Sequence, residues 1–175
     1  MKIIRHFITI TAHRHRVMFY CFKAGLYLQG LTHDLSKYSF TEFFRGAKYY
    51  VGTRSPIGVE RRTKGYSMAW LHHKGRNKHH FEYWVDLNLE SKKYEPIVMP
   101  KRYVAESFLD HLAASKVYNK KNFKPEMLLD YYYTKDKPSV PMHEESRILL
   151  EMLFNMYIEK GEKEVFKYIK KNLRK

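Results

Sequence analysis

Apolar side chains recur at steps of three and four residues over much of this sequence, the spacing of one face of an α-helix. The first such stretch covers residues 2–28, as one helix or two close ones. It places His13 beside the apolar stripe, whereas His15 lies off that face. Further helices are predicted over residues 103–118, 127–133, 144–160 and 162–173, the last two forming a helical hairpin that turns at Gly161.

Local signals predict shorter elements between these helices. Ser39 and Glu42 have the spacing of a capping box, which predicts a helix over residues 40–51, and Ser67 can cap a helix that continues into His72 and His73. Gly25 and Gly30 are expected to end the first helical stretch. Glycine and arginine predict a loop over residues 52–65. A further segment is predicted from residue 79 to residue 89, and an extended connector over residues 96–100.

The pattern contains no convincing pair of strands, so the predicted fold class is all-α. A chain of 175 residues that is 44% hydrophobic can close a proper core, which excludes a disordered protein. We expect one domain over residues 1–175, with the metal-site core in about 1–118 and peripheral helices in 125–175.

Cysteine content and hydropathy bear on location. The single cysteine, Cys21, excludes an internal disulfide and fits a reducing cytosol. No apolar run approaches the roughly 20 residues that a membrane span needs. We therefore expect a cytoplasmic protein without a membrane partner.

The formal net charge is +15, and the basic residues are spread over the whole chain. Such a surface attracts phosphate-bearing partners, either small molecules or nucleic acid, without identifying them. A solvated basic coat without a partner is an equally good interpretation. The oligomeric state is left open.

Two short blocks concentrate chemistry-bearing residues. One is His33-Asp34-Leu35-Ser36-Lys37, and the other, residues 72–80, begins and ends with a pair of histidines; together they hold five of the ten histidines. Imidazoles mixed with carboxylates suit Fe, Mn, Zn, Co or Ni, whereas carboxylates alone would suit Mg or Ca. The sequence therefore predicts a site for one or two transition metal ions.

In its order of residues the chain resembles the HD superfamily of metal-dependent phosphohydrolases. That family has an early histidine, an adjacent His-Asp, two further histidines in two-metal members, and an aspartate on a later helix. The resemblance implies an HD-domain-like helical bundle. Its metal ligands would be His13 (or His15), His33, Asp34, Asp110 and two among His72, His73, His79 and His80.

The resemblance also implies roles in catalysis. A water activated by the metal that Asp34 helps to hold would attack the phosphate of a nucleotide, cyclic nucleotide or nucleic acid. Lys37, with arginines from residues 54–62, would neutralise phosphoryl charge. Glu82 would orient a ligating histidine or carry a proton, although an exposed helix glutamate is an equally good interpretation.

Over nearly its whole length the chain is more similar to a family of small uncharacterised bacterial and phage proteins. The likeness is carried by residues 33–43 and by the paired histidines ahead of Glu82 and Trp84. Two other functions stay open. One is an HD-type di-iron oxygenase, and the other is a non-catalytic basic nucleic-acid-binding protein with a structural metal.

Overall fold

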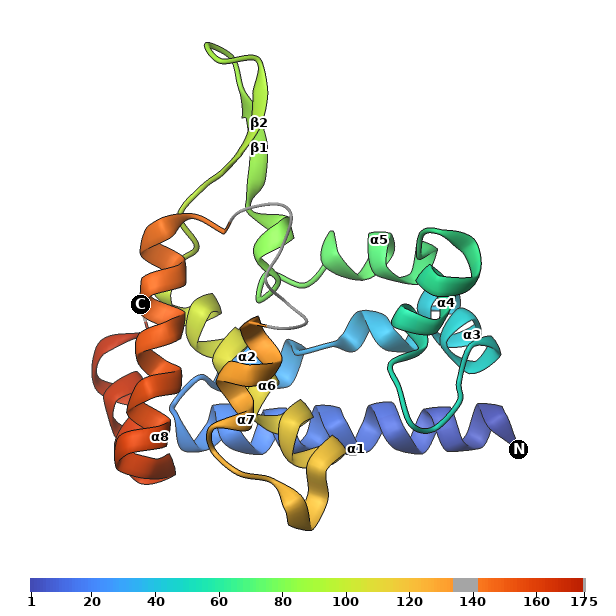
Figure 1. Ribbon diagram of the computed structural model, residues 1–175, viewed down its shortest axis with the longest axis horizontal. Helices are drawn as coiled ribbons and strands as arrows, with labels where there is room; N and C mark the ends of the chain where they lie inside the picture. The colour runs from blue at the N-terminus through green and yellow to red at the C-terminus, as the bar shows by residue number, and fades with distance from the viewer. Residues whose placement is uncertain (134–141, 175) are drawn as a thin grey trace.

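The computed structural model describes residues 1–133 and 142–174, which fold mainly into helices, so the all-α prediction is confirmed (Figure 1). The α-helices are α1 (Lys2–Lys23), α2 (Tyr27–Thr32), α3 (Phe40–Lys48), α4 (Pro56–Lys64), α5 (Met68–Lys74), α6 (Lys101–Asn119), α7 (Met127–Tyr131) and α8 (Glu144–Asn172). Short 3-10 helices are η1 (Leu35–Tyr38), η2 (Phe81–Tyr83) and η3 (Lys120–Asn122).

A sharp turn separates α1 from α2. Gly25 has a φ of 76°, a left-handed conformation that glycine adopts without steric cost, and α1 ends just before it. The prediction that Gly30 ends a helix is wrong, because this residue lies inside α2. A Cβ at Gly30 would lie 2.9 Å from the Cβ of Cys21, so the glycine serves the close approach of α2 to α1.

Most of the loop predicted over residues 52–65 is a helix, α4, which runs from Pro56 to Lys64. Pro56 occupies the first turn of α4 and Gly65, with a φ of 81°, ends it. Proline at the start and glycine just past the end are favoured helix boundaries, and here they outweigh the charged composition that predicted a loop. Ser39 and Ser67 accept hydrogen bonds from Glu42 N and Trp70 N, so both predicted N-caps are confirmed.

The prediction that no strands pair is also wrong. Strand β1 (Val85–Asn88) pairs antiparallel with β2 (Lys93–Pro96), and the hairpin projects from the helical body (Figure 1). Each strand has four residues and is largely exposed. Val85-Asp86-Leu87-Asn88 does alternate apolar and polar residues, but the prediction assigned this short run to the stretch over residues 79–89.

The core forms where α6 packs between α1 and α8. Phe108 and Leu112 of α6 are fully buried, as are Leu153 of α8 and Val17 of α1. Helix α8 thus completes the core that holds α6 in place. Gly161 interrupts α8 with a φ of 76° and a ψ of 179°, which confirms the predicted break at this residue.

None of the helices in the described part of the chain has the length and apolar character to cross a bilayer.

A close approach between α1 and α3 generates a prediction about stability. A Cβ at Gly46 would lie 2.3 Å from Nε2 of His6, which is 5% exposed. We expect Gly46→Ala to lower the free energy of unfolding by about 1 to 3 kcal/mol through overpacking, measured by urea denaturation. The control is Gly58→Ala, whose new Cβ would meet its nearest neighbour at 3.8 Å and should be neutral or stabilising. A double variant His6→Ala/Gly46→Ala should cost less than the two single changes together; simple additivity would contradict the clash.

Candidate metal centre

The His33-Asp34 pair lies at a backbone turn between α2 and η1. Helix α2 ends at Thr32, and Asp34 then adopts a φ of 54° and a ψ of 20°, a left-handed conformation that costs free energy for a residue with a Cβ. Both residues are 1% exposed. The turn thereby directs a neighbouring imidazole and carboxylate into the same interior site.

One group of potential ligand atoms surrounds Oδ2 of Asp34. Nε2 of His33 lies 3.4 Å and Nε2 of His13 lies 3.7 Å from this oxygen. Asp110 from α6 contributes Oδ1, which is 2.8 Å from Nε2 of His13 and 3.6 Å from Nε2 of His33. Three separate segments therefore converge on one point, and His13 belongs to the group, whereas His15 is exposed outside it.

A second group surrounds the other oxygen of the same carboxylate. Oδ1 of Asp34 lies 3.3 Å from Nε2 of His73 and 3.6 Å from Nε2 of His79. His80 completes this group. One carboxylate thus faces two sets of ligand atoms, one with each oxygen.

The turn after α5 makes the second group possible. Gly75 follows the last residue of α5, and Nδ2 of Asn77 then donates to the carbonyl of His73 at 2.8 Å and to Oγ of Ser36 at 2.7 Å. Asn77 is 6% exposed and ties the turn to η1. His79 and His80 can consequently fold back over His73 without belonging to the same helix.

The donor atoms fit a metal ion. Two ligands bound at about 2.1 Å to one ion lie about 3.0 to 3.4 Å apart, and the separations around Asp34 fall near that range. Nε2 of His33, His79 and His80 are buried without a hydrogen-bond partner among the described residues, as is Oδ1 of Asp34. Buried polar atoms are normally paired, and a metal ion would supply one common partner for these atoms.

Two buried carboxylates contact Nδ1 of the histidine rings, the nitrogen that does not face Asp34. Oε1 of Glu106 lies 2.8 Å from Nδ1 of His33 and 3.2 Å from Nδ1 of His79, so one residue links the two groups. Oε2 of Glu42 lies 2.8 Å from Nδ1 of His73. A proton on each Nδ1 would donate to these carboxylates and leave Nε2 free to bind a metal.

Neither glutamate was among the candidates from the sequence. Glu106 precedes Asp110 by four residues and therefore lies on the same face of α6, which is the one signal that could have identified it. Glu42 has the spacing of a capping box with Ser39, but its side chain is directed to the histidines of α5 instead. Because the capping box already explained Glu42, the sequence offered no reason to expect its contact with His72 and His73.

His72 does not join the site, contrary to its candidacy as a ligand. Successive residues on a helix point about 100° apart, so His72 and His73 cannot both face inward. Nδ1 of His72 lies 2.6 Å from Oε1 of Glu42, and its side chain is 18% exposed. Among the described residues, the groupings that could hold an ion include neither His72 nor Glu82, which lies in η2.

Lys37 lies at the edge of the site. Its Nζ is 2.5 Å from Oδ2 of Asp34, and its side chain is 25% exposed. Of the arginines expected to face a phosphate, Arg61 stacks over Trp70 at 5.0 Å from the ring centroid. Lys37 is therefore the cation nearest to the two groups.

The charges of the site are strongly coupled. Burial opposes ionisation of His33, but the carboxylates of Asp34, Asp110 and Glu106 outweigh it and raise the pKa of His33 to about 10. Burial also opposes ionisation of Asp34, yet His33, Lys37 and two further imidazoles hold the pKa of Asp34 well below its usual value. Burial lowers the pKa of His80 well below its ordinary value, so this ring is neutral and ready to act as a ligand.

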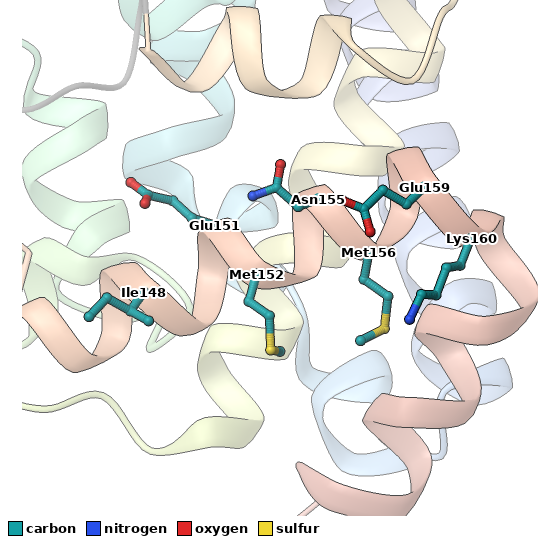
Figure 2. A pocket seen from close by; sticks show the side chains of 7 residues that line it. All are labelled: Ile148, Glu151, Met152, Asn155, Met156, Glu159 and Lys160. Carbon is teal, nitrogen blue, oxygen red and sulfur yellow. The ribbon is translucent and has the colours of Figure 1, made fainter.

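A surface depression along α8 is not part of this site (Figure 2). None of its lining residues belongs to the groups that could hold an ion. The residues lining it are Ile148, Glu151, Met152, Asn155, Met156, Glu159 and Lys160. We assign no chemistry to it.

Comparison with known proteins identifies a family without an assigned activity. The profile of a family of unknown function, DUF5662, matches residues 2–156, and the chain belongs to that family. Neither a curated protein nor a solved structure matches the chain. The matched range includes both groups of potential ligands.

The coupling predicts the titration of the metal-free protein. Histidine NMR in the presence of a chelator should show His33 protonated until about pH 10, and Glu106→Gln should lower the pKa of His33. Because the pKa of His33 is higher in the folded than in the unfolded protein, its charge stabilises the fold fully below about pH 6.5. That stabilisation is lost as the pH rises toward 10. A His33 pKa near 6.5 in the folded protein would contradict the proposed charge coupling.

Proposed function

We propose that this member of an uncharacterised family is a metal-dependent phosphohydrolase with a centre for two transition metal ions. The observation that carries the proposal is the carboxylate of Asp34, which faces one set of ligand atoms with each oxygen. A bridging carboxylate between two ions a few ångströms apart is suited to displacement at phosphorus, where attacking and leaving oxygens both need stabilisation.

The donor types favour Fe, Mn, Zn, Co or Ni. Each set combines imidazole nitrogen with carboxylate oxygen, whereas Mg and Ca prefer oxygen alone. The first ion would be held by His13, His33, Asp34 and Asp110, and the second by Asp34, His73, His79 and His80. When bound, such ions supply Lewis acidity that activates water and polarises phosphoryl oxygens.

The chain's own residues supply orientation and charge. Glu106 contacts Nδ1 of His33 and of His79, and Glu42 contacts Nδ1 of His73. These contacts would keep the imidazole rings in the orientation that metal binding needs. Asp110 and His13, at 18% and 13% exposed, are the partly exposed members of the first group. In the second group His80 is partly exposed, but its Nε2 is buried, so we expect substrate to reach the centre from the side of Asp110 and His13. Lys37 would leave its contact with Asp34 and neutralise phosphoryl charge when the ions compensate that carboxylate.

Metal content tests the assignment of the ligands. Asp34→Asn should abolish binding at both positions, because this residue belongs to both sets, and Asp110→Asn should weaken the first position alone. His13→Gln should lower metal affinity by at least about tenfold, whereas His15→Gln, two residues away and exposed, should leave it unchanged. Elemental analysis after dialysis against limiting metal measures the stoichiometry. Equal effects at His13 and His15 would show that the ligands are assigned wrongly.

Activity tests the reaction class. Protein loaded in turn with each of the five metals should hydrolyse p-nitrophenyl phosphate or its bis ester, and Lys37→Gln should lower kcat by about ten- to a hundredfold with metal content retained. Lys48→Gln, an exposed lysine on α3, is the matched control and should leave kcat unchanged. Absence of hydrolysis together with dioxygen consumption by the Fe(II) form would replace this proposal with an oxygenase. Absence of both activities would favour a structural metal.

A further inference from the structure

A groove of about 590 Å³ lies between α1 and the C-terminal end of α6. Four of the side chains that line it are basic, and none is acidic. Its apolar part is formed by Ala12, Val117 and Phe123. The basic residues are Arg16, Lys116, Lys120 and Lys121.

The four cations are not equivalent. Nζ of Lys116 is paired with Oε2 of Glu162 at 2.8 Å and lies over the rings of Tyr20, Phe123 and Tyr157. Lys116 therefore has partners within the protein and stabilises the packing of the groove wall. The other three side chains are exposed, and no ion pair joins them to a carboxylate within residues 1–133 and 142–174. These three positive charges, on Arg16, Lys120 and Lys121, are available to a ligand.

The groove continues the open edge of the metal centre. Asp110, Ala114 and Val117 share one face of α6 and are all partly exposed, so this face leads from the centre to the groove. On α1, Arg16 stands about one turn beyond His13, the other partly exposed member of the first ligand group. Seven residues of helix separate Asp110 from Val117 by about 10 Å along the axis.

We propose that this groove binds the phosphodiester backbone of a single-stranded nucleic acid whose scissile phosphate lies at the metal centre. This inference rests on the proposed phosphohydrolase function and names its substrate class. A separation of about 10 Å exceeds the reach of one phosphate group, so the groove contacts neighbouring phosphates of a longer chain. The apolar wall contacts sugars and bases, which an inorganic polyphosphate lacks.

The charge of the whole chain supports a polymer over a free nucleotide. A net charge of +15 spread along the chain attracts a ligand that extends beyond one pocket. A single strand can follow the shallow groove, with its flexible backbone meeting exposed cations in turn.

Binding of a fluorescein-labelled phosphorothioate oligothymidine to the metal-loaded protein, measured by anisotropy, tests the groove without requiring turnover. The variant Arg16→Gln/Lys120→Gln/Lys121→Gln should weaken binding by at least about tenfold and lower the slope of log affinity against log salt by about 2. The control Lys64→Gln/Lys92→Gln/Lys93→Gln removes equal charge from exposed positions on α4 and the β-hairpin. It should change affinity by less than about threefold.

Equal weakening by the two triple variants would overturn the proposal, because the surface would then act through net charge alone. Displacement of the oligothymidine by thymidine triphosphate at equal phosphate concentration would also overturn it, in favour of a mononucleotide. Groove-dependent binding without hydrolysis of any phosphate ester would uphold the groove and reject the phosphohydrolase. Hydrolysis of p-nitrophenyl phosphate without groove-dependent binding would uphold the phosphohydrolase and reject the groove as its substrate-binding site. Unchanged metal content in the groove variant confirms that the centre is intact.

Discussion

The structure depends on the burial of one carboxylate between two sets of imidazoles. Asp34 is 1% exposed and lies in a left-handed backbone conformation, so the chain accepts both a desolvation cost and a backbone cost at this position. Helices α1 and α6, together with the turn after α5, are arranged so that their polar residues meet this carboxylate. The apolar packing of α6 between α1 and α8 fixes that arrangement, because it sets where His13 and Asp110 lie.

The balance of charge at the site is suited to binding a cation. Four buried or partly buried carboxylates, those of Asp34, Glu42, Glu106 and Asp110, converge on the histidines. Although burial disfavours their charged forms, neighbouring imidazoles and hydrogen bonds keep the pKa of each below its ordinary value. In the metal-free protein His33 supplies part of the compensating charge by retaining its proton. A divalent ion would release that proton and compensate the carboxylates directly.

The sequence predicted what depends on periodicity and missed what depends on distant partners. Helical spacing distinguished the inward His13 from the outward His15, and it placed Asp110 on a buried helix. It could not select among the histidines of residues 72–80, since α5 ends at Lys74 and the turn that Asn77 stabilises changes their directions. Glu106 and Glu42 escaped notice because a glutamate in an amphipathic helix carries no mark of its partner 73 or 31 residues away in sequence. The β-hairpin was missed because the alternation in Val85–Asn88 covers only four residues and was included in the stretch predicted over residues 79–89.

The chain as a whole is positively charged, whereas carboxylates gather around Asp34. This difference in sign bears on the order in which metal and substrate would bind at the proposed site. A phosphate drawn to the basic groove would be repelled by the carboxylates of Asp34 and Asp110 unless cations stood between them. If the site binds metal and phosphate as proposed, metal binding would therefore precede productive binding of substrate. On the same proposal, ions bound to the buried ligand atoms would convert a centre that repels phosphate into one that attracts it, and they would release Lys37 from its contact with Asp34.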